Sequence, residues 1–447
     1  DKIKKEGETM KIISIFVGKI FVIIGKLMHR GSSLPGMMAL KVDKKILSKL
    51  KYPKTKLIVT GSSGKGSTSS LIADVLTDNG YSICFNNAGS NLKYGVTTAC
   101  IKNCNLLGKI KKDVLILEVD ERYVKEIYQD IKPDYLIVTN ITKDQPPRQY
   151  HVDIILKEIE HNLPSNTNII ITMDEPYLRN FELDLPNKML YYSVDKNKYS
   201  YKNQLFENLN IYYCPKCGAK LKYDYYNFET LGKYECPKCD FKWIKPKDIA
   251  TNLDLDKGLI KIDSQILSIG GDMLIHAYNT LAAYTFLKAI GIDSQKIIAS
   301  INRYNHNKNI EFVKDGKLYK ALNCKAENAT TYNACVYKTY LDKDLKDIVI
   351  GWKEISRRYN HFDVSWLYDV EFELLNNKSL NKIYAVGIDK ENIKKRLLLA
   401  GIPESKIITA DNLSEIKESI EQSRAKKVYG ILNFDYMEPF KDTLGGE

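Results

Sequence analysis

The 447-residue sequence lacks several features that would place it in common functional classes. It has no Arg-rich arm and no aromatic RNA-binding motif, so we do not expect a nucleic-acid partner despite the net charge of +12. A basic excess of this kind also suits nucleotides and phosphorylated lipids. No secretory cleavage pattern is present and no uncharged run is long enough to span a bilayer, so we expect a cytoplasmic protein with reduced thiols.

Residues 10–28 are apolar apart from Lys11, Lys19 and Lys26, which fall on one side of a helical wheel. Two alternatives stay open for this segment. It lies on the inner face of a membrane with its lysines toward the lipid headgroups, or it packs on the domain that follows. We expect residues 1–50 to form a leader with this helix, a turn at residues 31–36 and a short helix near residues 41–50.

Strand-like and helix-like runs alternate over residues 55–175, which predicts a parallel α/β sheet. The expected strands, some of them continuous apolar runs typical of strands buried on both faces, are residues 57–60, 83–85, 114–118, 135–139 and 168–172. A second alternation follows, with strands expected at residues 348–350, 383–386, 407–409 and 428–432. The predicted fold class is α/β, with a central phosphate-loop domain at residues 51–305 and a C-terminal Rossmann-like domain at residues 306–447.

The run Thr-Gly-Ser-Ser-Gly-Lys-Gly-Ser-Thr at residues 60–68 lies between a buried-type strand and a helix-like run. In such a turn the backbone N–H groups approach phosphates, and the helix N-terminus adds partial positive charge. Lys65 would reach the β- and γ-phosphates of ATP, and Ser67 or Thr68 would hold Mg²⁺. The residues expected to bind the nucleotide here are Gly61, Gly64, Lys65, Gly66, Ser67 and Thr68.

Polar residues follow two of the predicted strands at the edge of the sheet where the phosphate loop lies. Glu118 ends one strand, at a position where a carboxylate can hold Mg²⁺. We expect Asp120 either to cap a helix or to support the metal ligands without binding the metal itself. Asn140 and Asp144 follow the next strand. They would contact nucleotide, metal-bound water or substrate, or serve the bend that the following two prolines impose.

Two CxxC pairs, Cys214-Pro-Lys-Cys217 and Cys236-Pro-Lys-Cys239, are separated by 18 residues. This arrangement predicts a tetrahedral Zn²⁺ site with four thiolate ligands. Because four thiolates leave no open position for water, the metal would be structural. We expect the pairs to lie in an inserted β-rich zinc ribbon at residues 205–245.

Two further residues are weak signals by residue type alone. Asn279 opens a helix predicted at residues 276–290, and Asp363 precedes Ser-Trp after a strand of the C-terminal domain. Each fits a helix-capping role, and Asp363 could alternatively be a functional carboxylate presented at a domain edge.

In their order along the chain these motifs resemble those of Mur ligases and folylpolyglutamate synthetases, ATP-dependent enzymes that join an amine to a carboxylate through an acyl phosphate. The matching motifs are the loop at residues 61–68, Glu118-Val-Asp-Glu, Thr139-Asn140 and the Asn279 helix. The cysteine module, Leu34-Pro35-Gly36 and Asp363-Val-Ser-Trp-Leu-Tyr-Asp are similar to the MurT branch, and the resemblance covers nearly the whole chain. MurT pairs with a glutaminase and amidates the glutamate of the lipid-linked cell-wall precursor. Archaeal pseudomurein peptide ligases are also Mur-type enzymes.

The resemblance implies roles for individual residues. Lys65 would serve the phosphates, Ser67 the phosphates and Mg²⁺, and Glu118 the same metal. Asn279 would contact the adenine, and the four cysteines would hold zinc. Asp363 matches the aspartate that assists the partner glutaminase.

The chain departs from the MurT pattern near the ATP and acceptor sites. The departures are Gly66-Ser67 for two threonines, Pro146-Pro147-Arg148, Ile275-His276, Lys308-Asn309, and Lys325-Ala-Glu-Asn-Ala for Lys-Asn-Pro-Ala-Gly. They favour a related reaction on a different substrate, so we expect a ligase that adds an amino acid to a pseudomurein-type cell-wall peptide precursor. The alternatives are a MurT subunit that uses ammonia from a glutaminase, and a non-catalytic ATP-binding scaffold.

Overall fold

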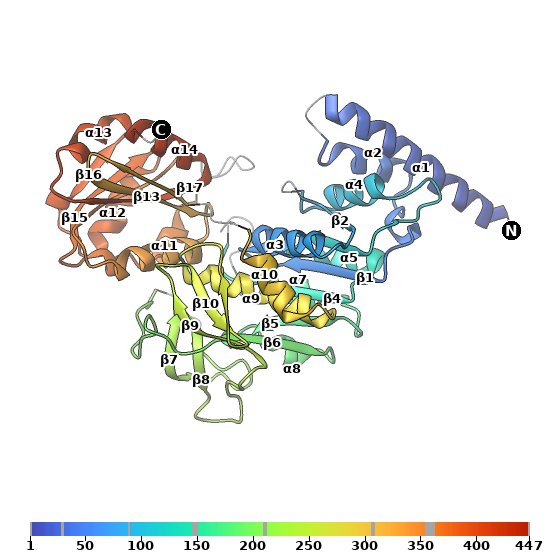
Figure 1. The fold of residues 1–447 in the computed structure, drawn as a ribbon, viewed down its shortest axis with the longest axis horizontal. Coiled ribbons are helices and arrows are strands. Elements are labelled where there is room, and N and C mark those ends of the chain that lie inside the picture. Colours follow the sequence, from blue (N-terminus) through green and yellow to red (C-terminus); the bar gives the residue numbers. More distant parts are fainter. Residues whose placement is uncertain are drawn as a thin grey trace.

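The structure is a computed structural model that describes residues 2–27, 31–87, 90–144, 151–208, 212–304, 309–353 and 363–445. Its strands form two large sheets and one separate hairpin (Figure 1). The predicted bend at Pro146–Pro147 and the departing residues Arg148 and Lys308 lie outside the described residues.

A nine-stranded sheet at the centre of the molecule has the order β11-β10-β9-β6-β5-β4-β1-β3-β2. Its bounds are β1 (Thr55–Thr60), β2 (Ile83–Phe85), β3 (Val114–Glu118), β4 (Tyr135–Val138), β5 (Asn168–Thr172), β6 (Met189–Val194), β9 (Asp248–Asp254), β10 (Leu259–Ile262) and β11 (Gln265–Ser268). Seven strands are parallel, and β10 and β11 form an antiparallel edge. The five strands predicted for residues 55–175 are confirmed. They pair in parallel, as predicted, and the antiparallel edge formed by β10 and β11 comes from residues 259–268, beyond the range of that prediction.

Helices cover both faces of this sheet. One face carries α3 (Lys65–Asp78), α9 (Leu274–Ala289) and α10 (Ser294–Ile301), and the other carries α4 (Lys93–Asn103), α5 (Val124–Ile131) and α7 (Val152–Glu160). The short helix α8 (Asn180–Asp184) precedes β6. Alternate residues of β1 enter the two cores, Leu57 and Val59 on the first side and Ile58 on the second. Burial on both faces explains the continuous apolar runs of these strands.

The C-terminal part of the chain forms a six-stranded sheet in the order β12-β13-β17-β14-β15-β16, with only β12 antiparallel. The strands are β12 (Ile310–Lys314), β13 (Lys317–Cys324), β14 (Lys346–Trp352), β15 (Leu380–Gly387), β16 (Ile407–Ala410) and β17 (Lys427–Asn433). The helices are α11 (Ala329–Leu341), α12 (Lys390–Leu399), α13 (Ser414–Glu421) and α14 (Phe434–Leu444), with 3₁₀ helices η2 (Ser365–Asp369), η3 (Phe372–Leu375) and η4 (Glu404–Lys406). The four strands predicted here are confirmed as β14, β15, β16 and β17. The residue boundaries given for the domains stay predictions.

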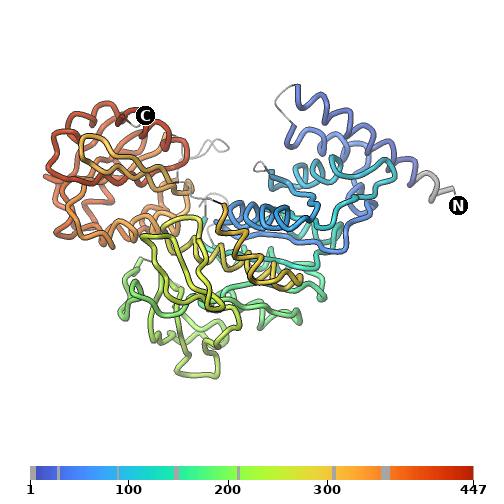
Figure 2. The backbone as a smooth tube through the Cα atoms, in the orientation of Figure 1, coloured from blue at the N-terminus to red at the C-terminus, as the bar shows by residue number. Residues whose placement is uncertain are grey.

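The N-terminal helices α1 (Lys2–Leu27) and α2 (Leu34–Val42) pack on α4, beside the β2 edge of the central sheet (Figure 2). The turn predicted at residues 31–36 is wrong in its second half, because Pro35 starts α2, where a proline costs no hydrogen bond. A Cβ added to Gly36 would lie 2.0 Å from the Tyr94 carbonyl oxygen, so glycine lets α2 approach α4 closely. The helix predicted near residues 41–50 is reduced to the 3₁₀ turn η1 (Leu47–Lys49).

Two of the three lysines of α1, Lys11 and Lys19, face the protein, and Lys26 is exposed. Lys11 is 4% exposed, and Lys19 Nζ donates to the Ile101 carbonyl oxygen at 3.1 Å. Of the two alternatives for this helix, packing on the following domain is observed, and the orientation with lysines toward headgroups is wrong. Among the described residues, no helix is both apolar enough and long enough to cross a membrane.

Candidate nucleotide site and cysteine cluster

The turn between β1 and α3 depends on two glycines with left-handed backbone, Gly61 at φ 127° and Gly64 at φ 80°. A Cβ added to Gly61 would lie 2.3 Å from Thr139 Oγ1, and one added to Gly64 would lie 2.3 Å from Asn279 Oδ1. The turn therefore meets the end of β4 on one side and helix α9 on the other. Residues that the sequence separates by more than two hundred positions are brought together here.

Replacing Gly64 by alanine should weaken ATP binding at least about tenfold, because the new methyl group would displace Asn279 from the loop. Gly80→Ala is the matched control. Gly80 also has a left-handed backbone, at φ 83°, but nothing lies within 4 Å of its added Cβ. Calorimetric titration with ATP should show weaker binding for Gly64→Ala alone. Equal affinities for the two variants would contradict the contact between Asn279 and the loop.

Asn140 and Thr139, which follow β4, hold the phosphate loop through hydrogen bonds to Ser63. The Asn140 side chain accepts a hydrogen bond from Ser63 N and donates one to the Ser63 carbonyl oxygen, both at 3.0 Å. Thr139 Oγ1 donates to the same carbonyl oxygen at 2.6 Å. Asn140, predicted as a direct nucleotide contact, here fixes the shape of the loop.

Lys65 is the first residue of α3 and is 8% exposed. Its Nζ donates to Glu121 Oε2 at 2.9 Å and to the Gly61 carbonyl oxygen. Burial alone would lower the pKa of Lys65, but the Glu121 carboxylate overrides it, so the pKa is raised and the side chain stays charged. The only sequence signal for Glu121 was its place in the acidic run after β3.

Glu118, the last residue of β3, lies against the first turn of α3. A Cβ added to Gly66 would be 3.3 Å from Glu118 Oε2, and the next residue, Ser67, lines the adjoining cavity. Thr68 is fully buried, and its Oγ1 has no hydrogen-bond partner among the described residues. Of the two predicted hydroxyl residues, Ser67 is therefore the one that lines the cavity, and a hydroxyl and a carboxylate are oxygen ligands of the kind that Mg²⁺ prefers.

Asp120 does not cap a helix as expected. Its carboxylate accepts two hydrogen bonds of 2.9 Å from the Arg122 guanidinium, and α5 begins only at Val124. The side chain therefore orders the turn after β3.

A cavity of about 320 Å³ lies between the loop, α9 and the C-terminal sheet, a volume typical of small-molecule sites. At one end it is lined by loop and helix residues that can donate hydrogen bonds to phosphates: Ser63, Gly64, Gly66 and Ser67. Elsewhere apolar side chains line it: Leu71, Ile269, Met273, Ile275, Ile301 and Phe434. Asn279 lies on the wall beside the loop. Polar side chains, among them His276, Asn309 and Lys325, share the rest of the lining with these apolar groups, a mixture that suits a nucleotide.

The C-terminal part contributes a second cation to the loop. Lys325 Nζ donates to the Ser62 carbonyl oxygen at 2.6 Å and pairs with the buried Asp144 carboxylate. Asn328 Nδ2 donates to Asp144 Oδ1 at 3.0 Å. Burial raises the pKa of Asp144 although Lys325 opposes this. Lys325 was noted in the sequence only as part of a departing segment, so its contact with the loop was not foreseen.

Asp363 lies on the C-terminal side of the same region. Its Oδ1 accepts from Ser365 N at 2.8 Å. The N-cap residue of η2 is Val364, which makes no side-chain capping bond, so Asp363 is not the helix cap that its residue type predicted. Nearby Glu327 is 2% exposed and has φ 56°. Burial, followed by the charges of Asp144 and Asp363, raises the pKa of Glu327 to about 7. The structure thus places Asp363 within electrostatic reach of the residues around the loop.

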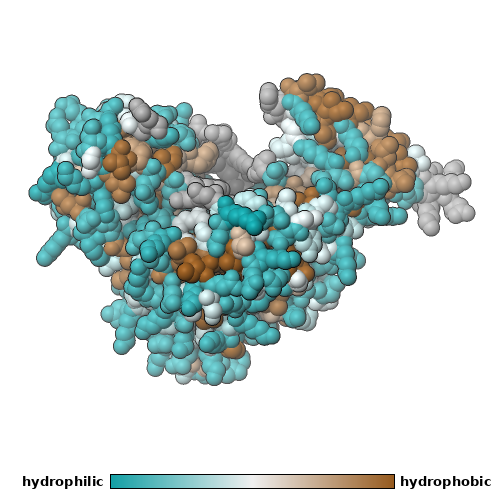
Figure 3. All heavy atoms as spheres, in the orientation of Figure 1, coloured by the Kyte–Doolittle hydropathy of each residue, from teal (hydrophilic) through white to brown (hydrophobic). Residues whose placement is uncertain are grey.

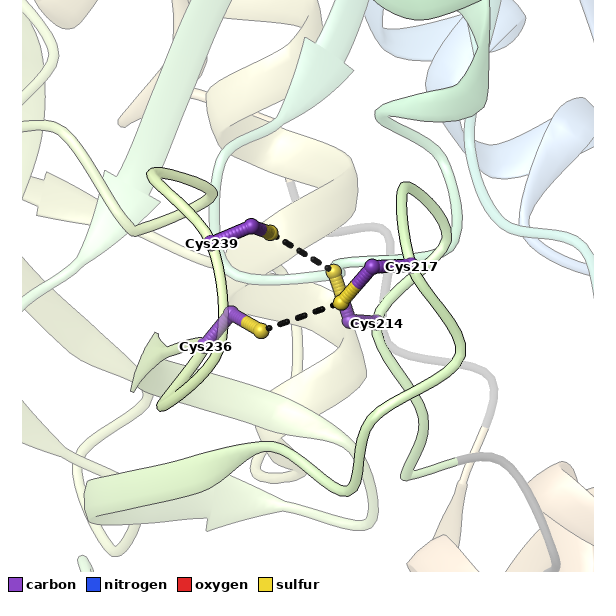
Figure 4. A group of neighbouring side chains, drawn as sticks. All are labelled: Cys214, Cys217, Cys236 and Cys239. Atoms are coloured by element: carbon purple, nitrogen blue, oxygen red, sulfur yellow. Dashed lines mark hydrogen bonds between the residues drawn. The ribbon is translucent and has the colours of Figure 1, made fainter.

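The four predicted cysteines converge on one point (Figure 4). The Sγ atoms of Cys214 and Cys239 are 3.6 Å apart, and those of Cys217 and Cys236 are 3.5 Å apart. Four thiolates around a tetrahedral zinc have sulfurs about 3.8 Å apart, so the cluster fits the ion. The two CxxC turns flank an antiparallel hairpin, β7 (Lys222–Phe228) and β8 (Leu231–Glu235).

The cysteine hairpin is tied to the helix that carries Asn279. The buried Asp174 carboxylate accepts from Trp243 Nε1 at 2.8 Å and from the Tyr278 hydroxyl at 2.7 Å. Trp243 closely follows the last cysteine, and Tyr278 directly precedes Asn279. A change in the hairpin therefore reaches the nucleotide cavity through one shared carboxylate.

The stability of this region should depend on pH through Glu229, at the tip of the hairpin. Burial raises its pKa to about 8 although Asn333 Nδ2 donates to it at 2.8 Å. The neutral Glu229 carboxyl stabilises the folded protein fully below about pH 4.5, the pKa of this group in the unfolded chain. This stabilisation is lost as the pH rises through about 8, its pKa in the folded protein. The melting temperature should fall over this range, and Glu229→Gln should flatten the fall. Glu235→Gln, on the exposed side of β8, is the control, and an unchanged pH profile in Glu229→Gln would contradict the assignment.

Comparison with known proteins identifies the two parts of the chain separately. Residues 59–230 match the Mur ligase middle domain, and residues 325–437 match the MurT ligase C-terminal domain. A curated relative from Staphylococcus aureus, named lipid II isoglutaminyl synthase (glutamine-hydrolyzing) subunit MurT, is 28% identical over 388 residues, 86% of each chain. The protein of the same name from Streptococcus pneumoniae is 26% identical and covers 97% of this chain and 96% of its own.

Solved structures share the fold. A pseudomurein peptide ligase type C from Methanothermus fervidus superposes with a TM-score of 0.69 at 17% identity, over 90% of this chain and 80% of its own. MurF from Acinetobacter baumannii gives a TM-score of 0.59 at 15% identity, over 92% and 80%. With the phosphate loop, the cavity and the two matching domains, the chain belongs to the Mur ligase family, in its MurT-like branch, and is an ATP-dependent carbon–nitrogen ligase.

Proposed function

We propose that the protein amidates a cell-wall peptide precursor: it activates a carboxylate of a lipid-linked peptide with ATP and joins it to ammonia supplied by a partner glutaminase. The observation that carries this proposal is the match of residues 325–437 to the MurT C-terminal domain, which contains both Lys325 and Asp363. Similarity to curated MurT subunits along most of the chain supports it further. These findings favour amidation over the peptide ligase that the sequence departures had favoured.

Residues of the loop would bind and orient ATP. Backbone N–H groups from Gly64 to Ser67, at the start of α3, would donate to the phosphates, and Lys65, held charged beside Glu121, would neutralise them. Asn279 would contact the adenine from the wall of the cavity. Ser67 and Glu118 would hold Mg²⁺, which screens the phosphate charge when bound. Fixed cations around the γ-phosphate are the main source of catalysis in phosphoryl transfer.

The reaction would proceed in two balanced steps. A substrate carboxylate oxygen attacks the γ-phosphorus of ATP, and the bond between this phosphorus and the oxygen that bridges to the β-phosphate breaks. The products are ADP, which carries the bridging oxygen, and an acyl phosphate. Ammonia then attacks the acyl carbon, phosphate departs, and the amine loses one proton. Lys325, which reaches the loop from the C-terminal side, is placed to neutralise the acyl phosphate.

The remaining predicted groups would support this site. Zn²⁺ held by the four cysteines would brace the hairpin and, through Asp174, the Asn279 helix. Asp363, half-buried in the MurT-type part, would lie where the glutaminase delivers ammonia. The proposed reaction takes place in the cytoplasm, where ATP is available.

The second candidate is a ligase that adds an amino acid to a peptide precursor. It is favoured by the segment from Lys325 to Ala329, where buried Glu327 replaces a smaller residue of the MurT pattern. The amine donor separates the two candidates. The purified chain should release ADP with lipid II and ammonium chloride, and with glutamine only after a glutaminase is added. Turnover supported by free amino acids and not by ammonia would establish the peptide ligase instead.

A further inference from the structure

Helix α1 has an orientation opposite to that of an ordinary surface helix, because much of its polar side is buried and its apolar side is exposed. Its polar and small residues Lys11, Ser14 and Gly18 face the protein, where Ser14 Oγ donates to the Ala39 carbonyl oxygen at 2.8 Å. Gly18 is needed there, since an added Cβ would lie 2.9 Å from Ile101. The ordinary arrangement buries the apolar stripe and exposes the polar one.

The outer side of α1 is a continuous apolar stripe. Its exposed members recur every three or four residues along one side of the helix: Ile12, Ile13, Phe16, Ile20, Ile23 and Leu27. Ile23 is 66% exposed and Leu27 is 79% exposed. From Ile12 to Leu27 the stripe is about 23 Å long at 1.5 Å per residue. Figure 3 shows these apolar side chains gathered over α1 on the face in view. Patches of this kind on a folded protein mark a contact surface.

Positive charge is concentrated in the same part of the molecule. Residues 1–56 contain 14 Lys and Arg against 4 Asp and Glu, a net of +10 out of the +12 of the whole chain. The remaining 391 residues therefore carry only +2. Exposed members of this group beside α1 and α2 include Lys26, Lys41, Lys44 and Lys45.

Apolar side chains continue beyond α1 into the turn after α4. Leu106 and Leu107 are 48% and 67% exposed, and exposed lysines 109 and 111 follow them. Gly108 of this turn lies against the side chains of Ile15 and Lys11, so the turn flanks α1. A linear apolar stripe with a cationic surround is complementary to the interface of an anionic bilayer, where apolar side chains enter the acyl boundary and lysines meet the headgroups.

We propose that α1 docks on the surface of an anionic phospholipid membrane with its Ile12–Leu27 stripe toward the lipid. The helix lies along the membrane, while Ser14 stays packed on α2 and Lys19 on α4. The nucleotide site does not enter this proposal, which stands whichever amine the enzyme uses.

The test is co-sedimentation of the full chain with phosphatidylcholine vesicles that contain roughly one third phosphatidylglycerol. The variant Ile23→Glu/Leu27→Glu places two charges on the stripe. The matched control, Ile388→Glu/Leu399→Glu, changes side chains of the same types that are 62% and 67% exposed on the C-terminal part. Because all four side chains are exposed, both variants should keep the wild-type melting temperature.

Wild type and control should bind these vesicles equally, and the stripe variant should bind at least about tenfold more weakly. Binding should also weaken in high salt and on vesicles of phosphatidylcholine alone, since the surrounding lysines add to the affinity. Equal binding by the stripe variant would overturn the proposal. A wild-type protein that stays in the supernatant would also overturn it. The same holds if the wild type does not bind vesicles and the stripe variant instead dissociates a dimer of this chain.

Discussion

Lys65→Ala should reduce ADP formation by at least about a hundredfold, because it removes the cation at the phosphates where charge builds up in the transition state. The matched control is Lys56→Ala, near the start of β1, the strand that precedes the loop; it breaks an ion pair of 2.6 Å with Asp134. Steady-state assays with the full substrates should show near-normal rates for the control.

Loss of Lys65 also removes an ion pair of the buried Glu121 carboxylate, so the variant should be less stable. The double variant Lys65→Ala/Glu121→Gln separates the two effects. It should recover melting temperature but not activity. Recovery of activity together with stability would show that Lys65 has only a structural role.

Cys214→Ser should lose the bound metal and weaken the whole hairpin. We expect wild type to carry one zinc per chain by elemental analysis, and the variant to carry much less, because three thiolates remain. The hairpin should then become sensitive to protease. ATP affinity should fall several-fold, since Trp243 and Tyr278 share the Asp174 carboxylate.

Cys104→Ser is the control, because it changes a buried thiol that lies outside the cluster. It should keep its zinc and its protease resistance. Treatment of wild type with a chelator should reproduce the Cys214→Ser behaviour. A wild type that contains no zinc after expression in zinc-rich medium would rule out the metal.

Local patterns in the sequence were sufficient for the parts of the fold that local physics determines. The buried strands β1, β3 and β5 are continuous apolar runs, and the cysteine spacing alone placed four sulfurs together. Gly61 and Gly64 could be placed in a phosphate loop because glycine permits the backbone that the turn needs.

Contacts between distant segments could not be predicted in the same way. Lys325 reaches Ser62 only because the C-terminal part docks over the loop, and nothing in its local sequence indicates that neighbour. Glu121 pairs with Lys65 from the segment that follows β3. Any of three acidic residues, Glu118 at the end of β3 or Asp120 and Glu121 after it, fitted the pattern. The packing of α1 was one of two alternatives that its sequence left open, because an amphipathic helix suits either a membrane surface or a protein, and here Ser14 and Gly18 pack inward.

The central claim is that a carboxylate is activated by phosphoryl transfer from ATP at the Lys65 loop. The most direct measurement follows oxygen from a lipid-linked peptide whose carboxylates carry ¹⁸O, during turnover with ATP and ammonia. An acyl phosphate predicts that each phosphate released contains one labelled oxygen and that the Lys65→Ala variant releases none. Phosphate that carries oxygen only from water and ATP would contradict this account.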